Sequence, residues 1–517
     1  MASEADSSVS PSGAGTRSTA AAVIARQDRI PIWSLSYLFI GIIGIGFLFT
    51  FYDIFVINVS FIQTCTQIVP GCTPQNSANY FGLPVLLNLA GYAVGALVLA
   101  PLADRFGRRN MLLFTLLLTG LGSLLTAFVN NYTTFIIARI ITGVGIGADL
   151  ALVNTYINEM APVSSRARYT SLIFIMSALG AFFGIWIGLW LTTPPADFPS
   201  GLPFAMATVK ITPSGPQFLG NGWRIMYIIG AVLAVIGILL RLELPESPRW
   251  LISRGRVGEA DEIVTDMEDR ARKKVPDLPA PAAEIPVQAG ATRIPYAEIF
   301  GNRLYLTRTL LLFVIWFLGY VTIYAIAQGL TTLLAGIIPP PANLPPPVAA
   351  ASVAGQAGVI AAFGTFGFIA TAVFAYFFGE RLERKLWLPI AAVLTIIGTL
   401  LIAVFASGNF ALAAIGSIIT FFGFNLWVPM TYSWSTENYP TRARATGFAL
   451  VDGVGHVGGG VGILVVAPLI PVLLSSLGTT TGPIVIFLII DAFLVAAAII
   501  AQFGTATRQK RLDEVSP

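Results

Sequence analysis

The sequence predicts an all-α membrane protein with twelve transmembrane helices arranged as two parallel six-helix repeats. Three observations support this fold class. Apolar runs of roughly 20 residues recur along the chain, only 11% of its 517 residues are charged, and two charged landmarks recur at nearly equal offsets. A soluble chain carries roughly 25% charged residues. Because a backbone in lipid must satisfy its own hydrogen bonds, we interpret each apolar run as a membrane-spanning helix.

Twelve runs are long enough to cross a bilayer, and an even number places both termini on the same side. They cover residues 33–60, 80–101, 111–130, 133–157, 169–192, 223–243, 306–330, 357–379, 386–406, 409–435, 444–471 and 481–503.

These runs divide the chain into five predicted parts. They are a disordered cytoplasmic tail (1–30), an N-terminal six-helix bundle (31–243), a cytoplasmic linker (244–305), a C-terminal six-helix bundle (306–503) and a second tail (504–517). Residues 1–25 are rich in Ser, Ala and Gly and have no apolar core, so no cleaved signal is expected. In the linker, residues 255–274 carry charges on most faces, which predicts one or two surface helices.

Lysine and arginine residues orient the helices, because they are concentrated in cytoplasmic loops. The loops on the opposite side contain only Lys210, with Arg224 at a helix start. We therefore expect a multi-pass protein of the cell (plasma) membrane with both termini in the cytoplasm. The basic residues are spread over many loops, so no nucleic acid partner is expected. One set of loops holds Arg105, Arg108, Arg109, Arg166, Arg168, Arg381, Arg384, Lys385, Arg442 and Arg444.

The only two cysteines, Cys65 and Cys72, lie in the first loop on the side opposite the termini. Both face an oxidising compartment, so a disulfide that closes this loop is plausible. Two unpaired thiols are the alternative.

Two charged landmarks reveal an internal duplication. ADRFGRR follows the second run and GERLERK follows the eighth, which places Asp104 and Glu380 276 positions apart. Glu159 follows the fourth run and Glu437 the tenth, at a separation of 278. These offsets predict a repeat of six spans with the same orientation, and such transporters bind their substrate near mid-membrane between the halves.

Several motifs resemble those of the major facilitator superfamily. D-R-F-G-R-R at 104–109 is similar to its G-x-x-x-D-R-x-G-R-R loop, although Ala100 replaces the usual glycine and Glu383 replaces the inner glycine of the second copy. LPESPRWL (244–251), RIITGVGIG (139–147), NEMAPVSSRARY (158–169) and FYDIFVIN (51–58) resemble the sugar-porter and organic-ion branches. The resemblance implies a metabolite:proton symporter of the major facilitator fold.

Charges at the cytoplasmic helix ends anchor the topology, and the resemblance implies that they also form a gate. Their ion pairs would hold the halves together in one state and break in the other. An anchoring role alone is the alternative. The expected members are Asp104, Arg105, Arg108, Glu159, Arg166, Glu246, Arg249, Glu380, Arg384, Glu437 and Arg442.

Charges within the spans are functional candidates, because each costs ~2.5–3.5 kcal/mol at mid-helix on insertion scales. Asp53 in span one and Arg139 in span four lie at similar depth and could pair. Protonation of Asp53 would release Arg139, and sugar porters use a matching aspartate as their proton site. A purely structural ion pair is the alternative.

Asp149 and His456, the only histidine, are further candidates for proton coupling. Asp149 lies deeper in span four, where a structural pair is the alternative. A histidine in span eleven can change its charge near physiological pH. Its alternative role is helix packing, with Asp452 one turn earlier as a possible partner. Asp491 in span twelve is interpreted as structural.

In the superfamily, spans one, four, seven and ten line the cavity, which implies a set of substrate-binding residues. Some of them could instead face lipid or the interfacial belt. The set is Asn58, Asn154, Tyr320, Tyr324, Gln328, Asn425, Trp427, Tyr432 and Trp434.

Taken together, the residues and the resemblance predict a secondary active transporter that carries a proton with a small polar metabolite by alternating access. An organic anion such as a carboxylate is favoured. A sugar or polyol comes next, since span seven has only Gln328 where sugar porters carry several glutamines. An exporter of the antiporter type or a membrane sensor is the alternative. No phosphate loop, metal cluster or nucleophile–base set is present in the sequence, so we expect no enzymatic activity, cofactor or metal. The protein is expected to be a monomer.

Overall fold

The long apolar runs form helices in the computed structural model, which describes residues 19–34, 37–162, 166–281, 295–379, 381–440, 443–508 and 515. Within these ranges, twelve helices are long and apolar enough to cross a membrane. This confirms the predicted fold class. A two-stranded hairpin is the only β-structure in the described part of the chain.

The first six spans consist of α-helices, one of which continues through a π-helical turn, η1. They are α2 (Tyr37–Ile68), α3 (Ala78–Val94) with η1 (Gly95–Leu99) and α4 (Ala100–Phe106), α5 (Arg108–Phe128), α6 (Tyr132–Met160), α7 (Arg166–Thr192) and α8 (Gly222–Arg241).

The last six spans are more often interrupted. They are α12 (Arg303–Ala327) with α13 (Leu330–Ile337), α14 (Pro346–Phe378), η3 (Arg384–Leu386) with α15 (Trp387–Phe405), α16 (Phe410–Leu426) with α17 (Val428–Glu437), α18 (Arg444–Gly455) with α19 (Val457–Val466), and α20 (Leu469–Ala501). The elements outside the spans are α1 (Ala20–Asp28), β1 (Thr208–Thr212), β2 (Gly215–Leu219), α9 (Pro248–Ser253), α10 (Val257–Arg272) and α11 (Pro295–Gly301).

Several spans are longer than the hydropathy pattern predicts, and three of them show why. Helix α2 continues to Ile68 rather than ending at residue 60, because its polar side chains find partners, such as the Ser60 carbonyl for Thr64. Helix α14 begins at Pro346 rather than 357, with prolines in the first turn, where no N–H is needed. Helix α20 begins at Leu469 rather than 481 and bends at Gly478, which has a φ of 77°.

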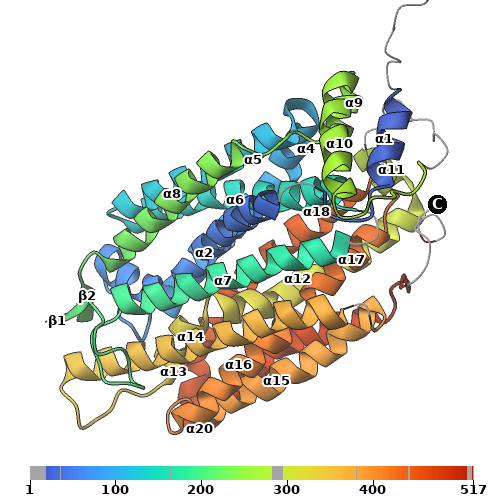
Figure 1. The fold of residues 1–517 in the computed structure, drawn as a ribbon. Helices are drawn as coiled ribbons and strands as arrows, with labels where there is room; N and C mark the ends of the chain where they lie inside the picture. Colours follow the sequence, from blue (N-terminus) through green and yellow to red (C-terminus); the bar gives the residue numbers. More distant parts are fainter. Residues whose placement is uncertain are drawn as a thin grey trace, which may run out of the picture.

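The helices form two halves, which are coloured blue to green and yellow to red in Figure 1. Helix α7 of the first half packs along α14 of the second, and α3 packs along α19. The α3–α19 approach requires glycine at Gly460, because a Cβ there would overlap the backbone of Leu86. The halves therefore meet closely along two pairs of helices.

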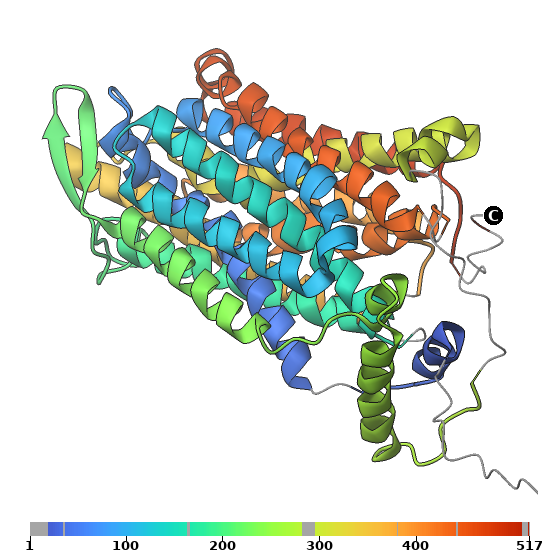
Figure 2. The same ribbon diagram turned by 90° about the horizontal axis from the view of Figure 1, so that it is seen from above.

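The two ends of the bundle differ (Figure 1, Figure 2). The hairpin end carries β1 and β2, and Gln67 of α2 donates to the Phe218 carbonyl at 2.7 Å. A disulfide joins Cys65 and Cys72 at this end. The opposite end, here called the terminal end, carries α1, α9, α10 and α11. Helix α2 thus anchors the hairpin through the side chains of its last turns.

The D-R-F-G-R-R motif ends α4 and begins α5 through a glycine turn. Gly107 has a φ of 99°, and a Cβ there would overlap Glu246 Oε2. The Glu246 carboxylate accepts the backbone N–H groups of Arg108 at 2.9 Å and Arg109 at 3.3 Å. Burial raises the pKa of Glu246 above its ordinary value of 4.5, and the hydrogen bonds from these N–H groups and from Ser247 offset only part of that rise. Glu246 therefore caps α5 from a distant loop.

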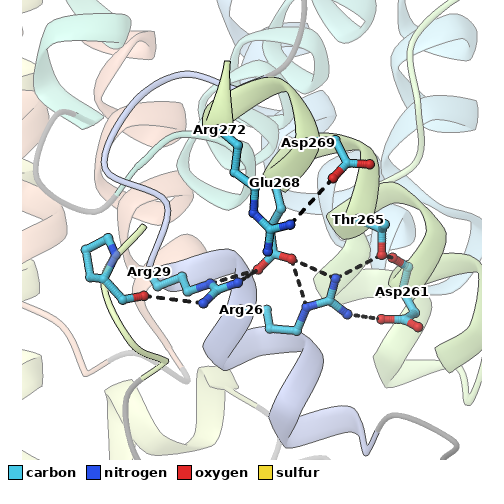
Figure 3. A network of polar contacts seen from close by, with 8 residues as sticks. Arg26, Arg29, Asp261, Thr265, Glu268, Asp269 and Arg272 are labelled. Carbon is cyan, nitrogen blue, oxygen red and sulfur yellow. Dashed lines mark hydrogen bonds and ion pairs between the residues drawn. The ribbon is translucent and has the colours of Figure 1, made fainter. Parts of the chain in front are cut away.

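The N-terminal segment differs from the disordered tail predicted for residues 1–30. Thr19 caps α1, and the helix packs Val23 against Leu251 and Val264 of the linker. Arg26 and Arg29 both bind Glu268 of α10, at 2.8 and 2.6 Å (Figure 3). Sequence composition missed α1 because its stability comes from this docking rather than from its own length. We call this contact the α1–α10 clamp.

Gly107→Ala tests the glycine turn. The substitution combines a left-handed backbone conformation with a clash against Glu246, so it should lower the free energy of unfolding by about 1–3 kcal/mol. The melting temperature of the detergent-purified protein measures the effect. Gly258→Ala is the matched control, because nothing lies within 4 Å of a Cβ added there. Equal melting temperatures for the two variants would contradict the assigned turn.

Glu268→Gln tests the clamp. Burial alone would raise the pKa of Glu268, but hydrogen bonds from Arg26 and Arg29 outweigh it and lower the pKa below 4.5. Because the pKa of Glu268 is lower in the folded protein than in the unfolded chain, its carboxylate stabilises the clamp fully at a pH above the unfolded-state pKa. This stabilisation is lost as the pH falls through the lower, folded-state pKa.

Hydrogen exchange at neutral pH provides the measurement. Charge-assisted bonds contribute about 1.5–3 kcal/mol each, so Glu268→Gln should speed amide exchange in α1 by about tenfold or more. Glu262→Gln, an exposed change on the same helix, is the control. Unchanged exchange of residues 20–28 in Glu268→Gln would refute the clamp.

Candidate functional site

Aromatic side chains and two titratable groups gather where the two halves face each other. We call this group the central cluster. Helices α3, α12, α17 and α18 and the α16–α17 and α18–α19 junctions supply it, so both halves contribute. Its members are Tyr92, Trp316, Tyr320, Tyr324, Trp427, Tyr432, Asp452 and His456.

His456 lies between aromatic rings from the two halves. Its ring stacks on Tyr92 with centroids 3.8 Å apart and lies 4.0 Å from Tyr320. Nδ1 is 2.7 Å from the backbone oxygen of Asp452. Because a carbonyl oxygen only accepts, Nδ1 carries the proton, and Nε2 is the acceptor in the neutral ring.

Asp452 connects the halves through its carboxylate. Oδ2 accepts from the Tyr92 hydroxyl at 3.0 Å, and Oδ1 accepts from the Tyr320 hydroxyl at 2.7 Å. Tyr92 belongs to the first half, whereas Tyr320 and Asp452 belong to the second. In the part of the chain that the structure describes, no lysine or arginine lies within 4.0 Å of this carboxylate. Asp452 therefore depends on neutral donors.

The predicted binding residues divide into groups. Tyr320, Tyr324, Trp427 and Tyr432 lie in the central cluster, and the indole Nε1 of Trp427 is buried without a hydrogen-bond partner. The other five lie outside it, and three of these have separate environments. Asn425 is buried at the end of α16, Asn154 bonds to the Leu150 carbonyl of its own helix, and Trp434 donates to the Thr505 carbonyl behind α17.

Asn58 and Gln328 form a latch between α2 and α12 rather than part of the cluster. Helix α12 ends at Ala327, so its last carbonyl groups need outside donors. The Asn58 amide donates to the Ala327 carbonyl at 2.6 Å, and Gln328 donates to the Ile54 carbonyl at 3.0 Å. Thr331 adds a bond to Asn58 Oδ1 at 2.5 Å. These bonds join the halves towards the hairpin end.

Asp53 and Arg139 form an ion pair inside the first half, with Nη1 and Oδ2 3.0 Å apart. The side chains are only 2% and 1% exposed. Ser123 of α5 donates to Asp53, and the Arg139 guanidinium lies over the Tyr227 ring. A buried pair of this kind leaves an uncompensated charge when one partner is removed.

Asp149 lies in a second buried pair, whose cation the sequence did not identify. Arg241 at the end of α8 contacts Asp149 at 2.5 and 3.2 Å, and Thr115 and Thr50 also donate to the carboxylate.

Asp491 differs from Asp53 and Asp149 in its surroundings. Its described partner is Thr399 at 2.5 Å, and Oδ1 is buried without a hydrogen bond.

The duplicated motifs form matching ion pairs at the terminal end. Arg108 binds Glu159 at 3.1 Å in the first half, and Arg384 binds Glu437 at 3.3 Å in the second. Arg384 follows Arg108 by 276 positions, the same offset that relates Asp104 to Glu380. Each pair joins helices of its own half, so neither connects the halves in this state.

The other predicted gate residues have separate environments. Arg249 pairs with Asp28 of α1, and the Arg105 guanidinium lies over the neighbouring Phe106 ring. Glu246 caps α5, as described above. Glu380, Arg442 and the side chains of Asp104 and Arg166 lie outside the described part of the structure.

Glu383 replaces the inner glycine in the second copy of the motif and changes the local capping. Its Oε1 accepts the backbone N–H of its neighbour Arg384 at 3.1 Å. The same oxygen accepts the N–H groups of Thr507 and Arg508 at 3.0 and 3.3 Å. The first half thus uses a distant glutamate for its cap, whereas the second uses a local one.

Sequence reasoning missed Tyr92 and Trp316 and considered Asp452 only as a partner of His456. Tyr92 lies in span two, which the resemblance did not place along the cavity. A signal was present, because a tyrosine hydroxyl deep in an apolar run needs a partner. Its partner is 360 positions away, and periodicity within one helix carries no information about such a contact.

Comparisons with known proteins show the family and the fold of the chain. The family described as Sugar (and other) transporter matches residues 38–335. The niacin transporter NiaP of Acinetobacter baylyi is 27% identical over 95% of this chain and 99% of its own. The 4-hydroxybenzoate transporter PcaK of the same organism is 29% identical over 72% of each chain.

A solved structure shows the same fold. The xylose transporter XylE of E. coli, in a partially occluded inward-open conformation, superposes with a TM-score of 0.62 at 18% identity, covering 92% of this chain and 100% of XylE. The chain therefore belongs to the sugar (and other) transporter family and has the fold of the major facilitator superfamily.

Proposed function

We propose that this protein is a proton-coupled symporter that carries a small aromatic or heteroaromatic monocarboxylate across the plasma membrane by alternating access. The central cluster is the observation on which this proposal depends. It lies between the halves and combines stacked aromatic rings with a histidine and an unpartnered indole N–H. Apolar walls with a few placed polar groups are typical of small-ligand sites.

The cluster suits a planar anion better than a sugar. The Tyr92 ring stacks on His456 at 3.8 Å, and the Tyr320 ring lies 4.0 Å from it at a 40° tilt, so aromatic faces suited to a flat ring line the contact between the halves. The Trp427 Nε1–H group is a free donor for a carboxylate, whereas His456 Nε2 would donate to it only in the protonated imidazolium ring. Niacin and 4-hydroxybenzoate, which name two of the relatives, are both ring carboxylic acids.

The Asp53–Arg139 pair supports proton coupling. A proton on Asp53 would neutralise the carboxylate that holds Arg139 at 3.0 Å, leaving the cation free to change partners. Because both side chains are buried, water cannot solvate the released Arg139 charge. The loss of the ion pair therefore alters the packing of α2 against α6. The Asp149 carboxylate is less free to exchange its partners, because Arg241 and two threonines all bind it.

Alternating access needs contacts that close one end at a time. The Asn58–Gln328 latch joins the halves towards the hairpin end, whereas the two terminal-end ion pairs stay within their halves. We propose that these terminal-end charges join across the halves in the opposite state. The excess of Arg at the terminal end and the disulfide at the hairpin end support a cytoplasmic location for both termini.

Uptake into liposomes tests the proposal. With a more acidic outside by one pH unit, one proton per anion corresponds to ~1.4 kcal/mol and about tenfold accumulation of labelled niacin or 4-hydroxybenzoate. A proton ionophore should abolish this accumulation. Gradient-driven uptake of xylose or arabinose without uptake of either acid would favour the sugar alternative.

Asp53→Asn tests the coupling site. The variant leaves Arg139 buried without its counter-ion, so it should lose about 3–5 kcal/mol of stability as well as uphill uptake. The double variant Asp53→Asn/Arg139→Gln removes both charges and should regain stability but not accumulation. Recovery of both stability and uphill uptake in the double variant would mean that the pair is only structural.

A further inference from the structure

Asp452 has no assigned task in the proposed transport cycle, although it lies at the centre of the molecule. Its side chain is 5% exposed, and its two carboxylate oxygens take the hydroxyl groups of Tyr92 and Tyr320. These phenols are the neutral donors that a bound carboxylate would use. In this state the protein's own carboxylate therefore takes the donors that an anionic ligand would need.

Resting on the proposed function, we propose that Asp452 is protonated when an anionic substrate enters the central cluster. The hydroxyl groups of Tyr92 and Tyr320 then donate to the substrate carboxylate instead of to Asp452. One proton binds to the Asp452 carboxylate, and no covalent bond of the substrate changes. The resulting carboxylic acid no longer repels the anion, and its hydroxyl becomes a donor.

The other buried aspartates do not fit this task. In this state Arg139 holds Asp53, and Arg241 holds Asp149, so each carboxylate has a counter-ion within the first half rather than donors shared between the halves. Asp491 bonds to Thr399 between α20 and α15, away from the contact between halves. Among the buried aspartates that the structure describes, Asp452 is the one bonded to tyrosines from both halves.

The groups that face Asp452 are mostly neutral. Four phenols approach it, from Tyr92 on α3, Tyr320 and Tyr324 on α12, and Tyr432 on α17. His456 on the same span lies with Nδ1 3.6 Å from Oδ1. A second carboxylate placed among these groups would make a like-charge pair, which cannot keep both charges in a buried site.

The sign of the pH effect follows from this arrangement. When Asp452 carries the proton, the acid is neutral and the anion binds tightly. As the pH rises, Asp452 ionises and competes for Tyr92 and Tyr320, so the affinity falls. One linked proton corresponds to about a tenfold rise in Kd for each pH unit above the midpoint. Proton uptake is thereby tied to substrate entry.

The experiment measures binding of labelled niacin and 4-hydroxybenzoate to the purified full-length protein between about pH 6 and about pH 8, where both probes are ionised carboxylates. In the wild type, Kd should rise with pH as described. Asp452→Asn resembles the protonated acid, so its Kd should stay near the low-pH value at every pH. Asp491→Asn is the matched control and should keep the wild-type pH profile.

Two further variants separate positioning from titration. Tyr92→Phe removes one donor to the Asp452 carboxylate, so the midpoint of the binding profile should move to higher pH. His456→Gln should weaken binding but retain the pH dependence. A pH profile that persists in Asp452→Asn and disappears in His456→Gln would assign the proton to the histidine and overturn the proposal. A Tyr92→Phe profile with an unmoved midpoint would also count against it.

Melting temperatures confirm that each variant is folded before its binding is compared. If Asp452→Asn unfolds, Asp452→Glu provides the second test, because a longer acid should keep the pH dependence with a shifted midpoint. Wild-type protein that binds neither probe but drives sugar uptake would refute the proposed function. Wild-type protein that binds the probes, together with an unchanged profile in Asp452→Asn, would refute only the role of Asp452.

Discussion

The high cost of a lone charge in lipid is the constraint on which this structure depends. Asp53 and Asp149 meet it with arginines contributed by other helices, and those contacts fix how the helices of the first half pack. Asp452 meets it with neutral hydroxyl groups, one of which belongs to the opposite half. The arginine-held carboxylates have their counter-ions within one half, whereas Asp452 shares its donors between the halves and must exchange one of them when the halves move apart.

This difference separates a rigid part of the molecule from a movable one. Inside the first half, Arg139 and Arg241 bind α2, α6 and α8 together through fully buried charges. Between the halves, apart from the Tyr92 bond to the Asp452 carboxylate, the described polar contacts are hydrogen bonds of amides, hydroxyls and an indole, such as those of Asn58 and Gln328. Neutral bonds of this kind contribute about 0.5–1.5 kcal/mol each, so they can be exchanged during a transport cycle.

Much of the fold follows from the sequence, because the length of apolar runs, the distribution of arginines and the 276-residue offset are all local or countable. The Asp53–Arg139 contact was also accessible, since two opposite charges at similar depth in lipid need each other. The contact of Tyr92 with Asp452 was not accessible. It depends on the register of α3 against α18, which the packing of glycines and aromatic rings sets. Helix α1 was missed for a related reason, because its stability comes from Glu268, 242 positions from Arg26.

The glutamate at position 383 breaks the equivalence of the two duplicated halves. In the first copy, Gly107 leaves room for a carboxylate that arrives from the segment between the halves. In the second copy, Glu383 supplies that carboxylate and binds the backbone of Thr507 and Arg508 just beyond the last span. Each six-helix unit is thus fastened to the chain segment that follows it, so exchanging the loops alone would not make one unit a substitute for the other.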